Sequence, residues 1–162
     1  MTDPITFRTE VYPSDVEVVH EIASSTGFFT PAEIAIACEL VSERLTRGLK
    51  SGYHFLFAEQ NKEVLGYTCY GPIACTQASF DLYWLVVRAI NRGQGLGSRL
   101  LTLTEQAIKG LGGKRVYIET SSRPLYAPTR IFYERRGYFK EAVLRDFYAP
   151  ADGKVIYVKA LE

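Results

Sequence analysis

The most informative segment of this chain is Val86-Val87-Arg88-Ala89-Ile90-Asn91-Arg92-Gly93-Gln94-Gly95-Leu96-Gly97-Ser98-Arg99-Leu100-Leu101. We expect an apolar strand that runs into a turn rich in arginine and glycine, and a helix that begins directly after the turn. Three glycines at alternate positions allow backbone N–H groups to converge with no Cβ in the way. A helix N-terminus adds about half a positive charge at the same place. The segment therefore predicts a binding site for a phosphate or pyrophosphate.

The spacing of the glycines excludes two common phosphate sites. A dinucleotide-binding fingerprint requires G-x-G-x-x-G, but the last position is Ser98 when the count starts at Gly93, and Leu100 when it starts at Gly95. A P-loop requires a lysine directly after its last glycine, and none follows here. The pattern that remains is R-x-x-G-x-G between a strand and an amphipathic helix.

This pattern resembles the pyrophosphate-binding motif of the GCN5-related N-acetyltransferase (GNAT) family, which holds the diphosphate of acetyl-coenzyme A (acetyl-CoA). The alternative for the hexapeptide alone is an ordinary glycine-rich turn. The resemblance implies that acetyl-CoA is the co-substrate and that the backbone of the preceding strand aligns its pantetheine arm. The cofactor-binding residues implied here are Leu85, Val87, Arg92, Gly93, Gln94, Gly95, Leu96, Gly97 and Ser98.

A second segment, Thr129-Arg130-Ile131-Phe132-Tyr133-Glu134-Arg135-Arg136-Gly137-Tyr138, resembles the other signature of the family, A-x-x-F-Y-E-x-x-G-F. The two motifs occur in the order and at the separation that the family shows. The resemblance covers 80–147 most strongly, which is under half of the chain. It implies that Tyr133 is the general acid and that Thr129 and Phe132 contact the cofactor.

The chemistry explains why a tyrosine suits this position. Amide formation from a thioester expels a thiolate, and a tyrosine hydroxyl is a neutral proton donor at pH 7. Phe132 points roughly 100° away from Tyr133 around a helix, so that one ring packs while the other faces the cofactor. The alternative is that Tyr133 is only a packing aromatic.

The motif departs from the family pattern at two positions, where Tyr126 replaces the usual Asn and Thr129 replaces the usual Ala. The usual Asn hydrogen bonds to the pantetheine arm, so its replacement leaves that contact open. Arg135 and Arg136 either reach the ribose phosphate of the cofactor or complement the helix dipole as exposed cations, and we favour the second role for at least one of them.

A primary amine has a pKa of about 10 and is mostly protonated in water, so its proton must be accepted directly or through water. Glu119 ends an expected strand, at a place similar to that of the base carboxylate in relatives that acetylate protein N-termini. We predict Glu119 as the base, with Asp81 at the start of the preceding strand as its rival. For each of them the alternative is a carboxylate that pairs with an arginine or faces water.

Composition limits the other classes of function. The chain has 162 residues, of which 47% are hydrophobic and 23% charged, with a formal net charge of +1. A single domain over residues 1–162 is therefore expected. Since no basic block occurs, a nucleic-acid partner is disfavoured. The start of the chain shows no signal peptide and no apolar run reaches membrane-spanning length, so we expect a cytoplasmic protein with no membrane partner.

Cysteines and histidines give no metal pattern. Cys38, Cys69 and Cys75 are odd in number and lie among apolar residues, so we expect reduced core thiols. His20 and His54 are far apart in sequence and are more typical of surface or packing positions than of ligands. No metal is therefore expected.

The order of elements predicts an α/β (α+β) fold of the GNAT type: a mixed, mostly antiparallel central sheet flanked by helices on both faces. A capping box at Thr30 and Glu33 begins one helix. The core faces of two helices are expected at Ile34, Cys38, Val41, Leu45 and Leu49, and at Leu96, Leu100, Leu103, Ala107 and Leu111. Strands are expected over 5–12, 53–59, 64–73, 80–87, 115–120, 138–147 and 154–161, and helices over 15–23, from 31 to about 48, from 96 to about 110, and from 127 to about 136.

Two functions from different classes fit these features. The first is an N-acetyltransferase in which a primary amine attacks acetyl-CoA directly in a ternary complex. The second is a non-catalytic acyl-CoA-binding module, which the presence of Tyr133 disfavours. The acceptor stays open between a small-molecule amine and a protein N-terminal amine, and a homodimer is compatible with the sequence.

Overall fold

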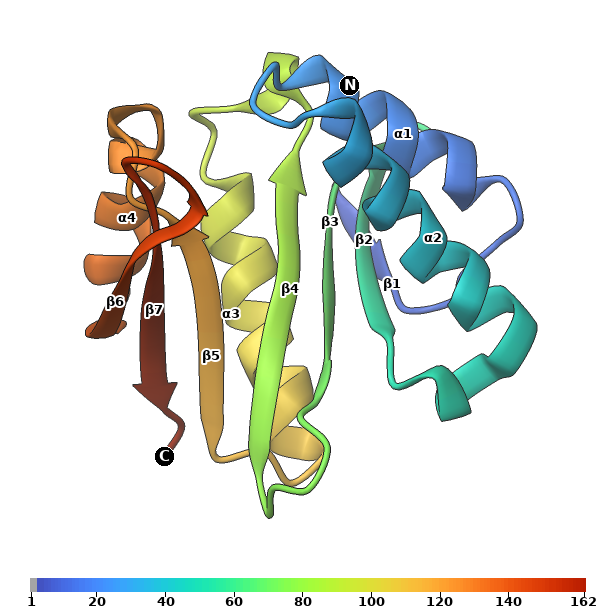
Figure 1. Ribbon diagram of the computed structural model, residues 1–162. Coiled ribbons are helices and arrows are strands. Elements are labelled where there is room, and N and C mark those ends of the chain that lie inside the picture. Colours follow the sequence, from blue (N-terminus) through green and yellow to red (C-terminus); the bar gives the residue numbers. More distant parts are fainter. Residues whose placement is uncertain (1–2) are drawn as a thin grey trace. The chain divides into compact units, whose positions relative to one another are not determined.

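The computed structural model describes residues 3–162, and Met1 and Thr2 lie outside the described residues. The order of helices and strands along the chain is the predicted one (Figure 1). The elements are β1 (Thr6–Arg8), α1 (Asp15–Ser25), α2 (Pro31–Arg47), β2 (His54–Gln60), β3 (Glu63–Pro72), β4 (Ser79–Val87), α3 (Leu96–Gly110), β5 (Arg115–Ser121), α4 (Ala127–Glu134), β6 (Phe139–Ala149) and β7 (Asp152–Ala160), with short 3₁₀ turns η1 (Gly48–Ser51), η2 (Ala89–Asn91) and η3 (Pro124–Tyr126).

The seven strands are ordered β1-β2-β3-β4-β5-β7-β6. Strands β4 and β5 run parallel, whereas the pairs β1–β2, β2–β3, β5–β7 and β6–β7 run antiparallel. The predicted mixed, mostly antiparallel sheet is therefore confirmed.

The chain forms two compact units. We call the residues up to Gly71 together with Trp84–Ala107 the N-terminal unit, and Pro72–Tyr83 together with Ile108–Glu162 the C-terminal unit. Each is described by itself below. The expectation of a single domain over 1–162 stays a prediction.

In the N-terminal unit, helices cover both faces of the sheet. Apolar side chains of α1 and α2 form one core with the alternate residues Phe55, Phe57, Tyr67 and Cys69 of β2 and β3. The opposite face carries Thr68, whose hydroxyl hydrogen bonds to that of Thr104 on α3 at 2.7 Å. Because successive side chains of a strand point to opposite faces, α3 lies on the other side from α1 and α2.

Local signals account for most boundaries in this unit. The Thr30 side chain accepts from the Glu33 N–H and the Glu33 carboxylate accepts from the Thr30 N–H, which confirms the capping box. Asn61 and Lys62 both have positive φ, as a two-residue hairpin turn between β2 and β3 requires.

At the start of α1, the Ser14 side chain makes no capping bond. The Asp15 carboxylate instead accepts from the Tyr12 N–H and from Arg8.

Three packing predictions were wrong. The buried face of α3 is Leu96, Leu100, Leu101, Thr104 and Ile108, whereas Leu111 is exposed. Two rows of apolar residues overlap on this helix, and the row that faces the sheet includes Thr104. The Thr104 hydroxyl can be buried there because it hydrogen bonds to the Thr68 hydroxyl. On α2, Ala37 and Val41 are buried, whereas Leu45 and Leu49 are exposed near the end of the helix.

The third error concerns the cysteines. All three are free, but only Cys69 is fully in the core, whereas Cys38 is half-buried and Cys75 is exposed after the end of β3.

Strand β1 is also shorter than expected, since pairing with β2 covers Thr6 to Arg8 only.

In the C-terminal unit, β5 pairs with β7 along its whole length, and β7 pairs with β6. The ladder between β4 and β5 covers three residue pairs and ends at Asp81 and Tyr117. Helix α4 is tied to the end of β5, because the Arg130 guanidinium donates to the Ser121 carbonyl at 2.7 Å and to the Arg123 carbonyl at 3.0 Å.

Candidate active site

The glycine loop of the N-terminal unit has the backbone of an anion-binding turn. Gly93 and Gly95 have φ of +76° and +78°, a conformation that residues with a Cβ rarely adopt. No atom lies within 4 Å of the place where a Cβ would be at either position. The Arg99 N–H donates to the Gly95 carbonyl, so α3 begins directly after Gly95. The first turn of α3 therefore presents N–H groups that have no acceptor within the helix.

These observations fit a diphosphate. The loop is exposed from Arg92 to Gly95, and Leu96 is buried beneath it. Among residues 3–162, the Asn91 Oδ1 atom at the start of the loop is buried without a hydrogen-bond partner. The open glycine backbone and the helix terminus would meet the phosphates, whereas the buried Asn91 Oδ1 atom is an acceptor and contributes no bond to an anion.

Three arginines in and beside the loop contact backbone carbonyls or aromatic rings. The Arg88 N–H donates to the Leu65 carbonyl at 2.7 Å, and its guanidinium donates to the Val64 carbonyl, so the end of β4 is fixed to β3. Arg92 lies over the Phe28 ring at 4.6 Å, and Arg99 lies over the Phe7 ring at 5.1 Å.

Gly66 was missed by the sequence analysis. A Cβ at this position would lie 2.9 Å from the Val86 carbonyl oxygen and 3.2 Å from the Val87 Cα. A glycine inside an apolar strand pattern signals close approach of another backbone, and this signal could have identified it. Gly66 lets β3 approach the part of β4 that holds Leu85 and Val87, both half-buried.

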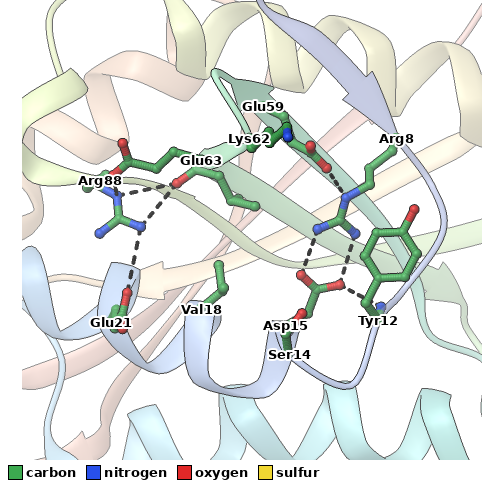
Figure 2. Close-up of a pocket in the computed structure, with 11 residues that line it drawn as sticks. Arg8, Tyr12, Ser14, Asp15, Val18, Glu21, Glu59, Lys62, Glu63 and Arg88 are labelled. Atoms are coloured by element: carbon green, nitrogen blue, oxygen red, sulfur yellow. Dashed lines mark hydrogen bonds and ion pairs between the residues drawn. The ribbon is translucent and has the colours of Figure 1, made fainter.

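A charged pocket of about 340 Å³ also lies in the N-terminal unit (Figure 2). Arg8 pairs with Asp15 and Glu59, and Arg88 lies within ion-pair distance of Glu63 and Glu21. Since both arginines of the pocket already pair with its carboxylates, we assign the pocket a structural role at the ends of β2 and β3.

Tyr133 of α4 is in the core of the C-terminal unit, with 6% of its surface exposed. Its ring contacts those of Phe132, Tyr138 and Tyr157, with centroid distances of 5.2, 5.6 and 6.4 Å. Burial raises its pKa well above the ordinary value, so the hydroxyl is protonated at neutral pH. None of the hydrogen bonds found within residues 3–162 involves this hydroxyl. The side chain is a buried proton donor that is not engaged by the protein.

The residues near Tyr133 in sequence make contacts of their own. Phe132 is half-buried, and the Arg136 guanidinium lies 3.7 Å from its ring centroid and donates to its carbonyl at 2.8 Å. Arg136 thus covers the end of the helix, which fits the role of a dipole-complementing cation. Thr129 is half-buried, and Tyr126 lies in η3 with the Arg123 guanidinium 5.5 Å from its ring.

Asp81 and Glu119 lie on the same face of the sheet, and Lys154 of β7 forms an ion pair with Glu119. Asp81 pairs with Tyr117 in the ladder, and Glu119 follows Tyr117 by two residues, so all three side chains share one face. The Lys154 ammonium lies 2.9 Å from the Glu119 carboxylate. Sequence reasoning missed Lys154, because only the strand register brings it to Glu119.

The electrostatics of Asp81 differ from those of a surface carboxylate. Burial and the neighbouring negative charge of Glu119 raise the pKa of Asp81 to about 6, while Lys154 acts in the opposite direction. Asp81 is therefore mostly ionised at pH 7.5 and becomes protonated in mildly acidic solution.

The acid and the carboxylates occupy opposite faces of the C-terminal sheet. Glu119 pairs with Ile156 on β7, and the next residue, Tyr157, points to the other face. The Tyr157 hydroxyl donates to the Glu134 carboxylate at 2.7 Å, which places α4 and Tyr133 on that other face.

An aromatic pair borders the carboxylate face. The Lys154 ammonium lies 3.8 Å from the centroid of Phe147 and 5.9 Å from that of Tyr148. The two rings meet edge to face, and about half of each side chain is exposed. A cation of this chain thus already sits between a carboxylate and an aromatic ring, an arrangement that favours ammonium groups.

The structure thus brings Asp81 and Glu119 together in the C-terminal unit, with Tyr133 across the sheet from them. The glycine loop lies in the N-terminal unit. Neither a cluster of three metal-ligating side chains nor a helix long and apolar enough to span a membrane occurs within residues 3–162.

Comparison with known proteins identifies the family. Residues 51–140 match the family model of the acetyltransferase (GNAT) domain. A protein from Desulfovibrio desulfuricans, assigned to the GNAT acetyltransferases, is 44% identical, with 97% of this chain and 99% of that one covered and a TM-score of 0.95. No sequence among the curated proteins matches.

More distant structures share the fold alone. The ribosomal-protein-S18-alanine N-acetyltransferase from Escherichia coli is 17% identical over 98% of this chain and 95% of its own, with a TM-score of 0.78. An aminoglycoside 6'-N-acetyltransferase solved with coenzyme A is 18% identical over 97% and 96%, with a TM-score of 0.75. The family match and the 44% identical relative agree with both sequence motifs, and this chain belongs to the GNAT family of N-acetyltransferases, enzymes that use acetyl-CoA.

Proposed function

We propose that the protein transfers the acetyl group of acetyl-CoA to a primary amine by direct attack in a ternary complex. The observation that carries this proposal is the buried Tyr133, whose hydroxyl is protonated at neutral pH and which lies within the residues that match the family model. In this reaction the proton donor serves the sulfur that leaves and the base serves the nitrogen that attacks, so the two groups act on different atoms and need not contact each other.

Each group of the chain has a defined task in this step. The amine nitrogen bonds to the carbonyl carbon, the C–S bond breaks, and the thiolate takes the proton of the Tyr133 hydroxyl. The proton of the amine goes to a carboxylate, directly or through water. The residues of the glycine loop hold the diphosphate, and the backbone of Leu85 to Val87 polarises the carbonyl. Orientation of the two substrates supplies much of the remaining rate enhancement.

Glu119 and Asp81 remain the two proposed bases. Glu119 is half exposed, and the Lys154 ammonium lies 2.9 Å from its carboxylate. Asp81 has a pKa of about 6, which is closer to neutrality and thus better matched to accept and release a proton. The pH dependence of the reaction separates the two.

If Asp81 is the base, kcat/KM is expected to rise as the pH increases through about 6, because the protonated carboxyl below that pH cannot accept a proton. The rate should be measured between pH 5 and pH 9 for the wild type, Asp81→Asn and Glu119→Gln. Each variant rate is divided by the wild-type rate at the same pH. The pH dependence that comes from the amine substrate then cancels, because it is the same in both rates.

For the true base, the ratio is expected to be roughly 10⁻²–10⁻⁴ near neutral pH and to recover at high pH, where the amine arrives deprotonated. The other variant serves as the matched control. If neither ratio depends on pH, water or backbone carbonyls remove the proton and both carboxylates are structural.

We propose a small-molecule amine or a protein N-terminal amine as the acceptor, with a cytoplasmic location that the free thiols support. The relatives named above act on a protein alanine and on aminoglycosides, which supports both classes. Release of free CoA should be measured with an alanine-initiated peptide, an aminoglycoside, a diamine and free amino acids. We expect release with at least one of these amines. Tight CoA binding with no transfer to any of them would favour a non-catalytic acyl-CoA-binding module.

A further inference from the structure

Lys154 is a lysine that lies largely out of solvent on the sheet face that carries Asp81 and Glu119. Only 13% of its side chain is exposed. Its ammonium lies 2.9 Å from the Glu119 carboxylate and 3.8 Å from the centroid of the Phe147 ring. Lysines are rarely buried unless they are paired, because removing an unpaired charge from water is costly. The Glu119 carboxylate is therefore the counter-charge that allows Lys154 to lie in this place.

The strand register determines where Lys154 lies. It pairs with Ser121 on β5, two residues after Glu119, so the long lysine side chain reaches Glu119 diagonally on the same face. The backbone beside Lys154 is held by two hydrogen bonds. The Gly153 N–H donates to the Ser122 hydroxyl at 2.8 Å, and the Ser122 N–H donates to the Gly153 carbonyl at 2.9 Å. The contact of Lys154 with Glu119 thus follows from the pairing of β5 with β7.

The Asp81 carboxylate has no such partner, since it takes part in none of the side-chain hydrogen bonds or ion pairs found within residues 3–162. The charged groups that act on it are Glu119 on β5 and Lys154 on β7. Tyr83 on β4 and Tyr117 on β5 share the same face. Burial and the charge of Glu119 raise the pKa of Asp81 to about 6, whereas Lys154 lowers it. One carboxylate of this face is therefore paired with a cation, and the other is not.

A proton has different consequences at the two carboxylates. Protonation of Glu119 removes the counter-charge of a lysine that lies largely out of water, which leaves the Lys154 ammonium unpaired. Protonation of Asp81 preserves the pair of Glu119 with Lys154 and removes a like charge from beside Glu119. Accepting a proton therefore costs less free energy at Asp81 than at Glu119.

We propose that Lys154 assigns the roles of the two carboxylates: it engages Glu119 as its ion-pair partner and leaves Asp81 to accept the proton of the attacking amine. This inference rests on the proposed function and narrows its two candidate bases to one. The amine nitrogen bonds to the carbonyl carbon as its proton passes to an Asp81 oxygen, directly or through water. The departing sulfur takes the proton of Tyr133, and exchange with solvent then returns Asp81 and Tyr133 to their starting forms. Asp81 is the catalytic base in this scheme, and Lys154 is a positioning residue.

The pH dependence of kcat/KM in variants of Lys154 tests this assignment. Lys154→Met removes the cation and leaves the charge of Glu119, so the pKa of Asp81 is expected to rise by roughly one unit. The ratio of variant to wild-type kcat/KM should then be roughly tenfold lower at pH 5 than at pH 8, where Asp81 is mostly ionised in both proteins. Lys154→Arg keeps a cation that can pair with a carboxylate and contact a ring, and its ratio should not depend on pH.

The double variant Lys154→Met with Glu119→Gln distinguishes the two carboxylates. It removes both members of the ion pair, so their opposite effects on Asp81 disappear together. If Asp81 is the base, the double variant is expected to be roughly three- to tenfold more active than Lys154→Met at pH 5. A double variant that is no more active than Lys154→Met at pH 5 overturns the assignment, as does a Lys154→Met ratio that is the same at pH 5 and pH 8.

A measurement without turnover separates this inference from the proposed function. Carbon-13 NMR follows the titration of the Asp81 carboxyl, whose signal is identified by its loss in Asp81→Asn. We expect the pKa of Asp81 to be roughly one unit higher in Lys154→Met than in the wild type, and an unchanged pKa overturns the role of Lys154. Circular dichroism and thermal melting check that each variant folds. Absence of acetyl transfer to any amine contradicts the proposed function, whereas transfer with an unchanged pH profile in Lys154→Met contradicts only this inference.

Discussion

Replacing Tyr133 by Phe is expected to lower kcat by roughly 10²–10⁴, the usual contribution of general acid catalysis, with nearly unchanged affinity for acetyl-CoA. The change removes one hydroxyl and little volume. Because no hydrogen bond within residues 3–162 involves that hydroxyl, the packing against Phe132, Tyr138 and Tyr157 should survive. Steady-state kinetics with a saturating acceptor, combined with calorimetry of CoA binding, measures both quantities.

The raised pKa of Tyr133 predicts how the wild-type kcat depends on pH. The hydroxyl is protonated throughout the neutral range, so wild-type kcat should not fall with pH because of Tyr133 until strongly alkaline solution. The desolvation that raises the pKa of Tyr133 would also raise the pKa of a thiol that forms beside it, so the two shifts act in the same direction.

Tyr138→Phe provides the matched control for Tyr133→Phe, since Tyr138 is also a buried tyrosine of this cluster. We expect it to leave kcat within a fewfold of the wild type. Unchanged turnover of Tyr133→Phe, with chemistry shown to limit the rate, would mean that Tyr133 only packs.

Replacing Gly95 by Val is expected to weaken CoA binding by about 100-fold, because a β-branched residue at positive φ costs up to roughly 3 kcal/mol and adds atoms where the phosphates approach the backbone. The positive φ of Gly95 is the origin of the strain, since a Cβ there meets no protein atom within 4 Å. Isothermal titration calorimetry with CoA measures the loss, and circular dichroism checks that the exposed loop change leaves the fold intact.

Gly110→Val is the control for Gly95→Val. Gly110 ends the same helix, and a Cβ there also meets no atom within 4 Å, but its φ is not in the left-handed region. We expect CoA affinity close to that of the wild type. Wild-type affinity in Gly95→Val would rule out the diphosphate assignment for this loop.

The boundaries that the sequence predicted well depend on neighbours along the chain. The capping box of Thr30 and Glu33, a turn within residues 60–63 and the start of α3 after Gly95 were all recognisable, because each is made by residues a few positions apart. Where two apolar stripes overlapped on α3, the sequence could not decide between them. The choice depended on Thr68, a residue of β3, which satisfies Thr104.

The sequence alone determined the family, the order of elements, the glycine loop and the motif that contains Tyr133, because steric and hydrogen-bonding rules act locally and leave a pattern in the residue order. Only the tertiary structure decided the surroundings of the carboxylates. Strand register brings Lys154 to Glu119 and leaves Asp81 half-buried beside a like charge, which raises its pKa. Such long-range pairing and burial depend on how distant strands align, and no local sequence pattern records that alignment.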